Sequence, residues 1–154
     1  MEGLVTAPKV YKVETSLARQ MAQPGGRTLI EAERRAQERL VRHESEVMAE
    51  IEAAVAALET LCAARPDGAS AEVYRLATGV LDLAGFFDTG PLFDAGYGLA
   101  DVADRMAVAA AWDWPSVEVY VRALRLILNG GCERNAATDH LLAGLKAVAA
   151  KTRV

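Results

Sequence analysis

Histidine and cysteine act as nucleophiles, proton carriers or metal ligands, and the sequence has two of each: His43, His140, Cys62 and Cys132. A metal site on a helix needs several ligands converging from one face. Neither histidine has a histidine, cysteine or carboxylate four residues further on that would complete such a face, and Asp139 is merely adjacent to His140. We therefore predict no metal and no cofactor, and we expect both histidines on the surface or at a helix edge.

The other reactive residue types do not form a catalytic pattern either. The two cysteines have no CxxC or other metal-binding spacing, so we expect a reduced thiol pair. Serine, histidine and aspartate follow no local order known from nucleophilic enzymes. The carboxylates are spread along the chain as solvated helix faces. The sequence therefore predicts a protein that is not an enzyme.

Composition predicts the fold class and restricts the partners. The 154 residues suit one domain, and 52% of them are hydrophobic, with alanine and leucine dominating. These are strong helix formers. A net charge of −4 argues against nucleic acid or an anionic membrane as the main partner. With no signal peptide and no apolar run long enough to span a bilayer, we expect a soluble cytoplasmic protein.

The chain divides at a PGG sequence. Residues 1–26 lack helical periodicity and are predicted to form an extended or flexible N-terminal arm, which either docks or remains a loose tail. Lys9, Lys12 and Arg19 would steer a docking arm toward an acidic surface. Residues 27–154 are predicted to form a helical bundle domain.

A long helix is predicted to follow the arm, from a capping box at Thr28–Glu31 to about Ala64. Such a helix is roughly 55 Å long. Its first half is highly charged and directs only Ala36 and Leu40 inward before a heptad seam begins. That half must overhang the bundle, pack on a second copy or be covered by the arm. The seam comprises Val47, Ile51, Ala54, Leu58 and Leu61.

Four shorter helices are predicted after the long one. Ser70 is expected to cap the first of them, and Pro91 to open the second. Pro115 is expected to open the third, with Asp113 or Trp114 as its cap, and the last should run from about Ala136 to Lys151. Each has one apolar stripe, and the second helix buries Val73, Leu76, Ala77, Val80, Leu83, Ala84 and Phe87. Short connectors make neighbouring helices antiparallel. We therefore predict an all-α fold, an antiparallel up-down helical bundle with a long first helix.

The outer face of the second predicted helix is the candidate partner-binding site. Two glycines lie within this helix, and each costs roughly 1 kcal/mol relative to alanine. Either a partner approaches this face closely, or a neighbouring helix of the bundle does. The face comprises Arg75, Thr78, Gly79, Asp82, Gly85 and Phe86.

The stretch EVYRLATGVLDLAGFFDTGPLFDAGYGLADV resembles histidine phosphotransfer (Hpt) domains. More narrowly, nearly the whole chain is similar to the CheE family of chemotaxis accessory proteins of alphaproteobacteria. That similarity lies in the KVYKVETSLARQM arm with PGG, the long charged helix, LAGFF and WDWPSVEVYVRALRLI. The resemblance implies an Hpt-like four-helix core and a cytoplasmic signalling role.

Three positions depart from the Hpt pattern. Thr78 stands where the phosphorylated histidine would be, Leu81 where lysine is usual and Asp82 where glycine is usual. A threonine ester is not comparable to phosphohistidine as a phosphoryl donor, and Asp82 would repel phosphate one turn away. The phosphotransfer chemistry is lost, while a docking surface is retained.

The resulting hypothesis is a non-catalytic signalling module that binds a CheY-type response-regulator receiver or a histidine-kinase domain in bacterial chemotaxis. One alternative is an active histidine phosphotransfer protein that uses His43 or His140. A second alternative is a structural homodimer formed through the long helix.

Overall fold

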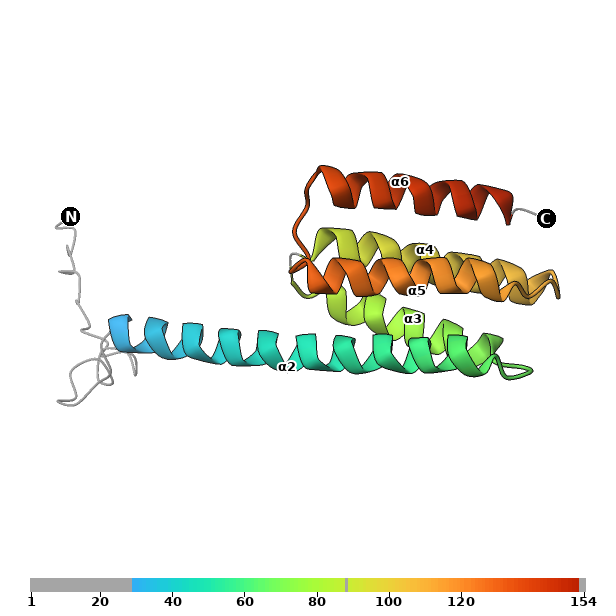
Figure 1. Cartoon of the computed structure of the whole chain (residues 1–154). Helices are drawn as coiled ribbons and strands as arrows, with labels where there is room; N and C mark the ends of the chain where they lie inside the picture. Colours follow the sequence, from blue (N-terminus) through green and yellow to red (C-terminus); the bar gives the residue numbers. More distant parts are fainter. Residues whose placement is uncertain (1–28, 88, 153–154) are drawn as a thin grey trace, which may run out of the picture. The chain divides into compact units, whose positions relative to one another are not determined.

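The computed structural model describes residues 29–87 and 89–152 (Figure 1). These residues form five helices: α2 (Leu29–Ala64), α3 (Ser70–Ala84), α4 (Gly90–Val108), α5 (Trp114–Asn129) and α6 (Ala136–Lys151). No strand occurs among them, so the all-α prediction of a helical bundle is confirmed. The predicted arm over residues 1–26 lies outside the described residues, as does Thr28 of the predicted capping box.

Residues up to 40 and residues from 41 onward belong to two separate units, which are described one at a time. In the first unit, every described residue of α2 is exposed, from Leu29 to Leu40. The expectation that Ala36 and Leu40 face inward is therefore wrong, and Leu40 is 52% exposed. The described residues of this unit contain no second element that could cover this stretch.

In the second unit, the remaining part of α2 contributes one buried stripe to the core. The stripe comprises Val47, Ile51, Val55, Leu58 and Cys62. The predicted seam is confirmed at Val47, Ile51 and Leu58, whereas Ala54 and Leu61 are only partly buried. The observed spacing follows the 3.6-residue period of a straight helix rather than the 3.5-residue heptad.

Helices α3, α4 and α5 each bury an apolar stripe. In the stripe predicted for α3, Leu83 and Phe87 are only partly buried, and Phe87 lies beyond the end of the helix. Val73, Val80, Leu92, Leu99, Val102, Val117 and Leu124 are all fully buried. Successive helices from α3 to α6 run in alternating directions (Figure 1). The central element is α4, which packs against α3, α5 and α6. Helix α6 has fewer buried residues than the others, namely Leu142 and Leu145.

Two glycines of α4 permit this central position. A methyl group on Gly96 would contact the Val80 side chain at 3.5 Å and the backbone nitrogen of Leu81 at 3.7 Å, so α3 lies directly against this residue. A methyl group on Gly98 would lie 2.7 Å from Cε1 of Tyr120, which is a steric clash. The Tyr120 hydroxyl then donates a hydrogen bond of 2.9 Å to the Leu145 carbonyl of α6. Tyr120 therefore connects three helices.

The helix ends are determined mainly by local hydrogen bonds. The Asp113 carboxylate accepts from the Ser116 backbone, which confirms Asp113 as the cap of α5. The buried Thr89 hydroxyl donates to the Ala84 carbonyl and so joins the end of α3 to the start of α4. Ser70 is not the cap of α3, as predicted, but its first residue, because the preceding Ala69 occupies the cap position.

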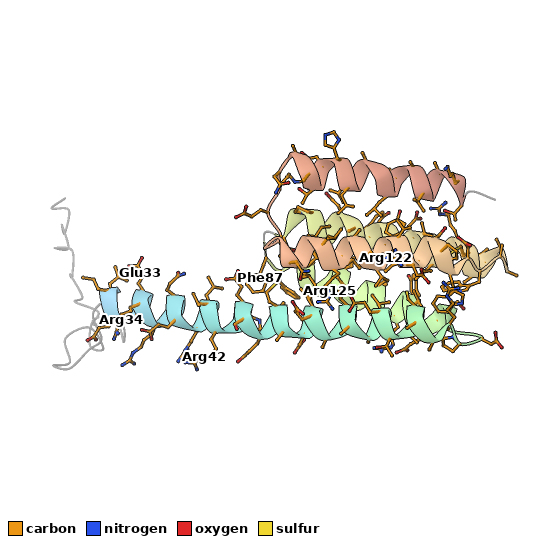
Figure 2. The ribbon with its side chains drawn as sticks, in the orientation of Figure 1. Glu33, Arg34, Arg42, Phe87, Arg122 and Arg125 are labelled. Atoms are coloured by element: carbon orange, nitrogen blue, oxygen red, sulfur yellow. The ribbon has the colours of Figure 1, made fainter. Side chains whose placement is uncertain are left out.

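Arg125 fastens α5 to α2. Its guanidinium donates two hydrogen bonds of 2.8 Å to Glu59 and one of 3.0 Å to Glu52. In Figure 2 the side chain points from α5 toward α2. The hydrogen bonds from Arg125 lower the pKa of Glu59 below its usual value of 4.5, and the pairing with Glu59 raises the pKa of Arg125.

Glycine-to-alanine changes at positions 79 and 98 should alter stability in opposite directions. At Gly79 the added methyl group meets no atom within 4 Å, so Gly79→Ala should stabilise the protein by about 0.5–1 kcal/mol through helix propensity. At Gly98 the methyl group collides with the buried, hydrogen-bonded Tyr120. Overpacking costs about 1–3 kcal/mol, which should exceed the gain in propensity. Urea unfolding measures both, and a stabilising Gly98→Ala would contradict the close approach.

The contact between Arg125 and Glu59 should also make stability depend on pH. Because the pKa of Glu59 is lowered in the folded state, the Glu59 carboxylate adds to the free energy of unfolding above about pH 4.5. This stabilisation is lost as the pH falls through the pKa of the folded state. Its side chain is 42% exposed, so Glu59→Gln should cost about 0.5–1 kcal/mol at pH 7. This difference should shrink toward zero in acid. Glu50→Gln, an exposed carboxylate on the same helix, serves as the control and should change little at either pH.

Candidate docking face

The six predicted site residues lie along one side of α3 and its C-terminal end. Arg75, Asp82, Gly85 and Phe86 are exposed, and Thr78 and Gly79 are partly exposed. Phe86 is the most exposed of the aromatic residues in the described chain, at 75%. The inner side of the same helix carries the buried stripe. The amphipathic pattern therefore separates core from outer face as predicted.

The two glycines of this face differ in their surroundings. Gly79 lies within α3, and no atom of residues 29–87 or 89–152 lies within 4 Å of the position that a Cβ would take. No neighbouring helix therefore requires glycine at position 79. Gly85 follows the last residue of α3, so the expectation that it interrupts the helix is wrong. Its amide donates to the Leu81 carbonyl and caps the helix end.

Local hydrogen bonds hold two polar groups of the face. Arg75 forms a bidentate pair with Glu72, at 2.6 and 2.9 Å, and this pairing lowers the pKa of Glu72 and raises that of Arg75. The Thr78 hydroxyl donates within its own helix, with the carbonyls of Tyr74 and Arg75 each 3.0 Å away. Asp82 forms no ion pair within residues 29–87 and 89–152. Asp82 therefore presents an uncompensated negative charge on this face.

Helix α4 adds two aromatic residues that the sequence analysis did not include. The Phe93 ring lies 3.7 Å from the position of a Cβ on Gly85, and Tyr97 is one turn further along α4. They are 40% and 60% exposed. We refer to Leu81, Gly85, Phe86, Phe93 and Tyr97 as the α3–α4 patch. The i, i+4 spacing of Phe93 and Tyr97 beside the buried stripe of α4 is the signal that could have identified them.

The two histidines occupy different settings. The ring of His43 lies 6.2 Å from that of Phe87, and its Nδ1 is 3.9 Å from a Glu46 carboxylate oxygen (Figure 2 labels Phe87). His140 is exposed on α6. One turn away from it is Gly144, where an added Cβ would meet nothing within 4 Å. The two imidazoles are on different helices and do not form one site.

The cysteine thiols are buried and unpaired. Burial raises the pKa of Cys62 to about 11, and burial also raises the pKa of Cys132. Both thiols are therefore protonated at neutral pH and are poor nucleophiles. Within the described part of the chain, no three histidine, cysteine or acidic side chains are grouped closely enough to hold a metal ion.

Comparison with known proteins identifies no family. No family model, curated protein or solved structure matches the chain. The resemblance to Hpt domains and to the CheE family therefore remains a prediction from the sequence pattern.

None of the helices in the described ranges is both long enough and apolar enough to span a membrane.

Proposed function

We propose that the chain is a non-catalytic, cytoplasmic signalling module whose α3 face binds a CheY-type receiver domain or a histidine-kinase domain. The observation that carries the proposal is Gly79. A glycine within a helix costs roughly 1 kcal/mol relative to alanine, and no atom of the described residues lies within 4 Å of the position that a Cβ would take here. A partner that approaches the backbone of α3 would make use of the missing side chain.

The surroundings of Gly79 support docking rather than chemistry. The exposed ring of Phe86 lies on the same face, and an exposed aromatic side chain is a common anchor of protein interfaces. Asp82, one turn from Thr78, would repel a phosphoryl group there, and Leu81 supplies no cation to hold one. The Thr78 hydroxyl is engaged with its own helix. A pseudo-phosphotransfer role fits both features: an exposed surface that a partner could bind, and residues that disfavour a phosphoryl group.

Binding to receivers and kinase domains from a chemotaxis gene cluster tests the proposal. Gly79→Arg and Phe86→Glu should weaken binding at least about tenfold, because each places a bulky or charged group in the contact. Gly144→Arg on α6 and Leu126→Glu on α5 are matched controls, since they change an equally open glycine and a 61% exposed leucine elsewhere. Isothermal titration should show unchanged affinity for both controls. Equal affinity for all four variants and wild type would exclude the α3 face.

A second candidate function is histidine phosphotransfer through His140. The observation that favours it is the small side chains around this exposed imidazole: Ala136, Ala137, Ala143 and Gly144 are all within one turn and all exposed. They would let a second active site reach the ring. No large apolar side chain is exposed on α6, whereas the α3 face has Phe86, so we rank the α3 face first.

Phosphotransfer is tested with a purified histidine kinase and radiolabelled ATP. Under the first function we expect no acid-labile label on the protein. Acid-labile label that is present in wild type and in His43→Gln but absent in His140→Gln would replace the first function with the second. His43 is the suitable control because its ring is held beside Phe87 on a different helix.

A further inference from the structure

We infer that the Asp67–Gly68 turn between α2 and α3 is a site of spontaneous aspartate isomerisation in the folded protein, whereas the Asn129–Gly130 pair at the end of α5 is protected by its helix. These are the two places in the sequence where aspartate or asparagine precedes glycine. Glycine in the second position favours the reaction because it has no side chain to hinder ring closure. The inference concerns a covalent modification of the chain itself, and it does not depend on the proposed function.

The reaction needs only the chain and water. The backbone nitrogen of Gly68 attacks Cγ of the protonated Asp67 carboxyl group, and the new C–N bond closes a succinimide ring while the carboxyl hydroxyl and the amide proton leave as water. Water then opens the ring at either of its two carbonyls. Attack at the main-chain carbonyl carbon breaks the original peptide bond and yields isoaspartate, whose main chain continues through Cβ and Cγ. Attack at Cγ returns aspartate. At Asn129 the leaving group is ammonia in place of water.

The Asp67–Gly68 turn has the freedom that ring closure requires. Asp67 and Gly68 are both exposed, and they lie in a turn outside the helices. Among residues 29–87 and 89–152, the Gly68 amide donates to no acceptor and Asp67 forms no ion pair. Gly68 has a φ angle of 73°, and a Cβ there would meet nothing within 4 Å. The attacking nitrogen and the carboxyl carbon are therefore free to approach each other without loss of a hydrogen bond or a packing contact.

The surroundings of the turn accommodate the product. Isoaspartate adds one carbon to the main chain at position 67. Pro66, Asp67 and Gly68 are all exposed, and they border a surface hollow of about 240 Å³. Ala69, which is 8% exposed, is the first residue after them that is buried. The extra carbon can therefore be taken up within residues 66–68, and α3 does not have to unpack for the reaction to proceed.

The Asn129–Gly130 pair has the opposite setting, although both of its residues are exposed as well. Asn129 is the last residue of α5, and the Gly130 amide donates to the Leu126 carbonyl at 3.0 Å. A helical ψ angle holds the following nitrogen away from the side-chain carbon, so the ring cannot close until the last turn of α5 opens. In an unfolded chain this pair is the more reactive one, because an ionised carboxylate resists attack by a nucleophile more than a neutral amide does.

The test ages the full-length protein at neutral pH and physiological temperature, folded in one sample and unfolded in guanidinium chloride in the other. Peptide mapping by mass spectrometry follows both sites, and an isoaspartate-specific methyltransferase with a labelled methyl donor counts isoaspartate independently. We expect Asp67 to isomerise at similar rates in both samples. Asn129 should react about tenfold more slowly in the folded sample, because at least one hydrogen bond must break first. Protection of Asp67 as large as that of Asn129, or no protection of Asn129, would overturn the inference.

Two variants make the comparison independent of side-chain chemistry. Asp67→Asn gives the chain an identical asparagine–glycine pair in each setting, so any difference between positions 67 and 129 comes from the structure alone. In the folded variant, position 67 should deamidate about tenfold faster than position 129, and in guanidinium chloride the two rates should be similar. Asp67→Ala removes the reactive carboxyl group and should abolish the methyl incorporation of aged wild-type protein. Equal rates at both positions of folded Asp67→Asn, or unchanged methyl incorporation in Asp67→Ala, would contradict the inference.

Discussion

The close approach of neighbouring helices to α4 is the constraint on which the bundle depends. Gly98 leaves room for the Tyr120 ring at a distance where a methyl group would collide, and Gly96 leaves room for the backbone of α3. The Tyr120 hydroxyl also donates to the Leu145 carbonyl of α6. The missing side chain at Gly98 therefore determines how both α5 and α6 pack against α4. Small residues where helices meet allow shorter separations than the usual 8–10 Å between axes.

The same constraint determines which surface the bundle presents. Bringing α3 and α4 together at Gly96 places their exposed flanks side by side, so that Gly85, next to Phe86 in the chain, lies against the Phe93 ring. The buried sides of both helices are occupied by aliphatic residues, and the aromatic rings are left outside. An exposed surface with aromatic residues from two segments thus results from the same contact that packs the core.

Periodicity was sufficient to predict the helices, because each one has an apolar stripe with few exceptions. The predicted last helix, residues 136–151, agrees with α6 at both ends. The role of each glycine could not be predicted. Gly79 and Gly98 look alike in the sequence, yet one faces open space and the other a buried ring, since the difference depends on a helix distant in the sequence. Leu40 was assigned inward by its spacing alone, although no second element among the described residues of its unit covers it.

The candidate site was predicted only in part, for a related reason. A helical wheel groups residues of one helix, so it found Asp82 and Phe86 but could not include Phe93, which enters the face from α4. Adding α4 changes what the face can do. On α3 alone, the main features were those that disfavour phosphate. With Phe93 included, the face gains a second exposed aromatic ring beside the end of α3, and that ring comes from a part of the chain that a helical wheel of α3 does not contain.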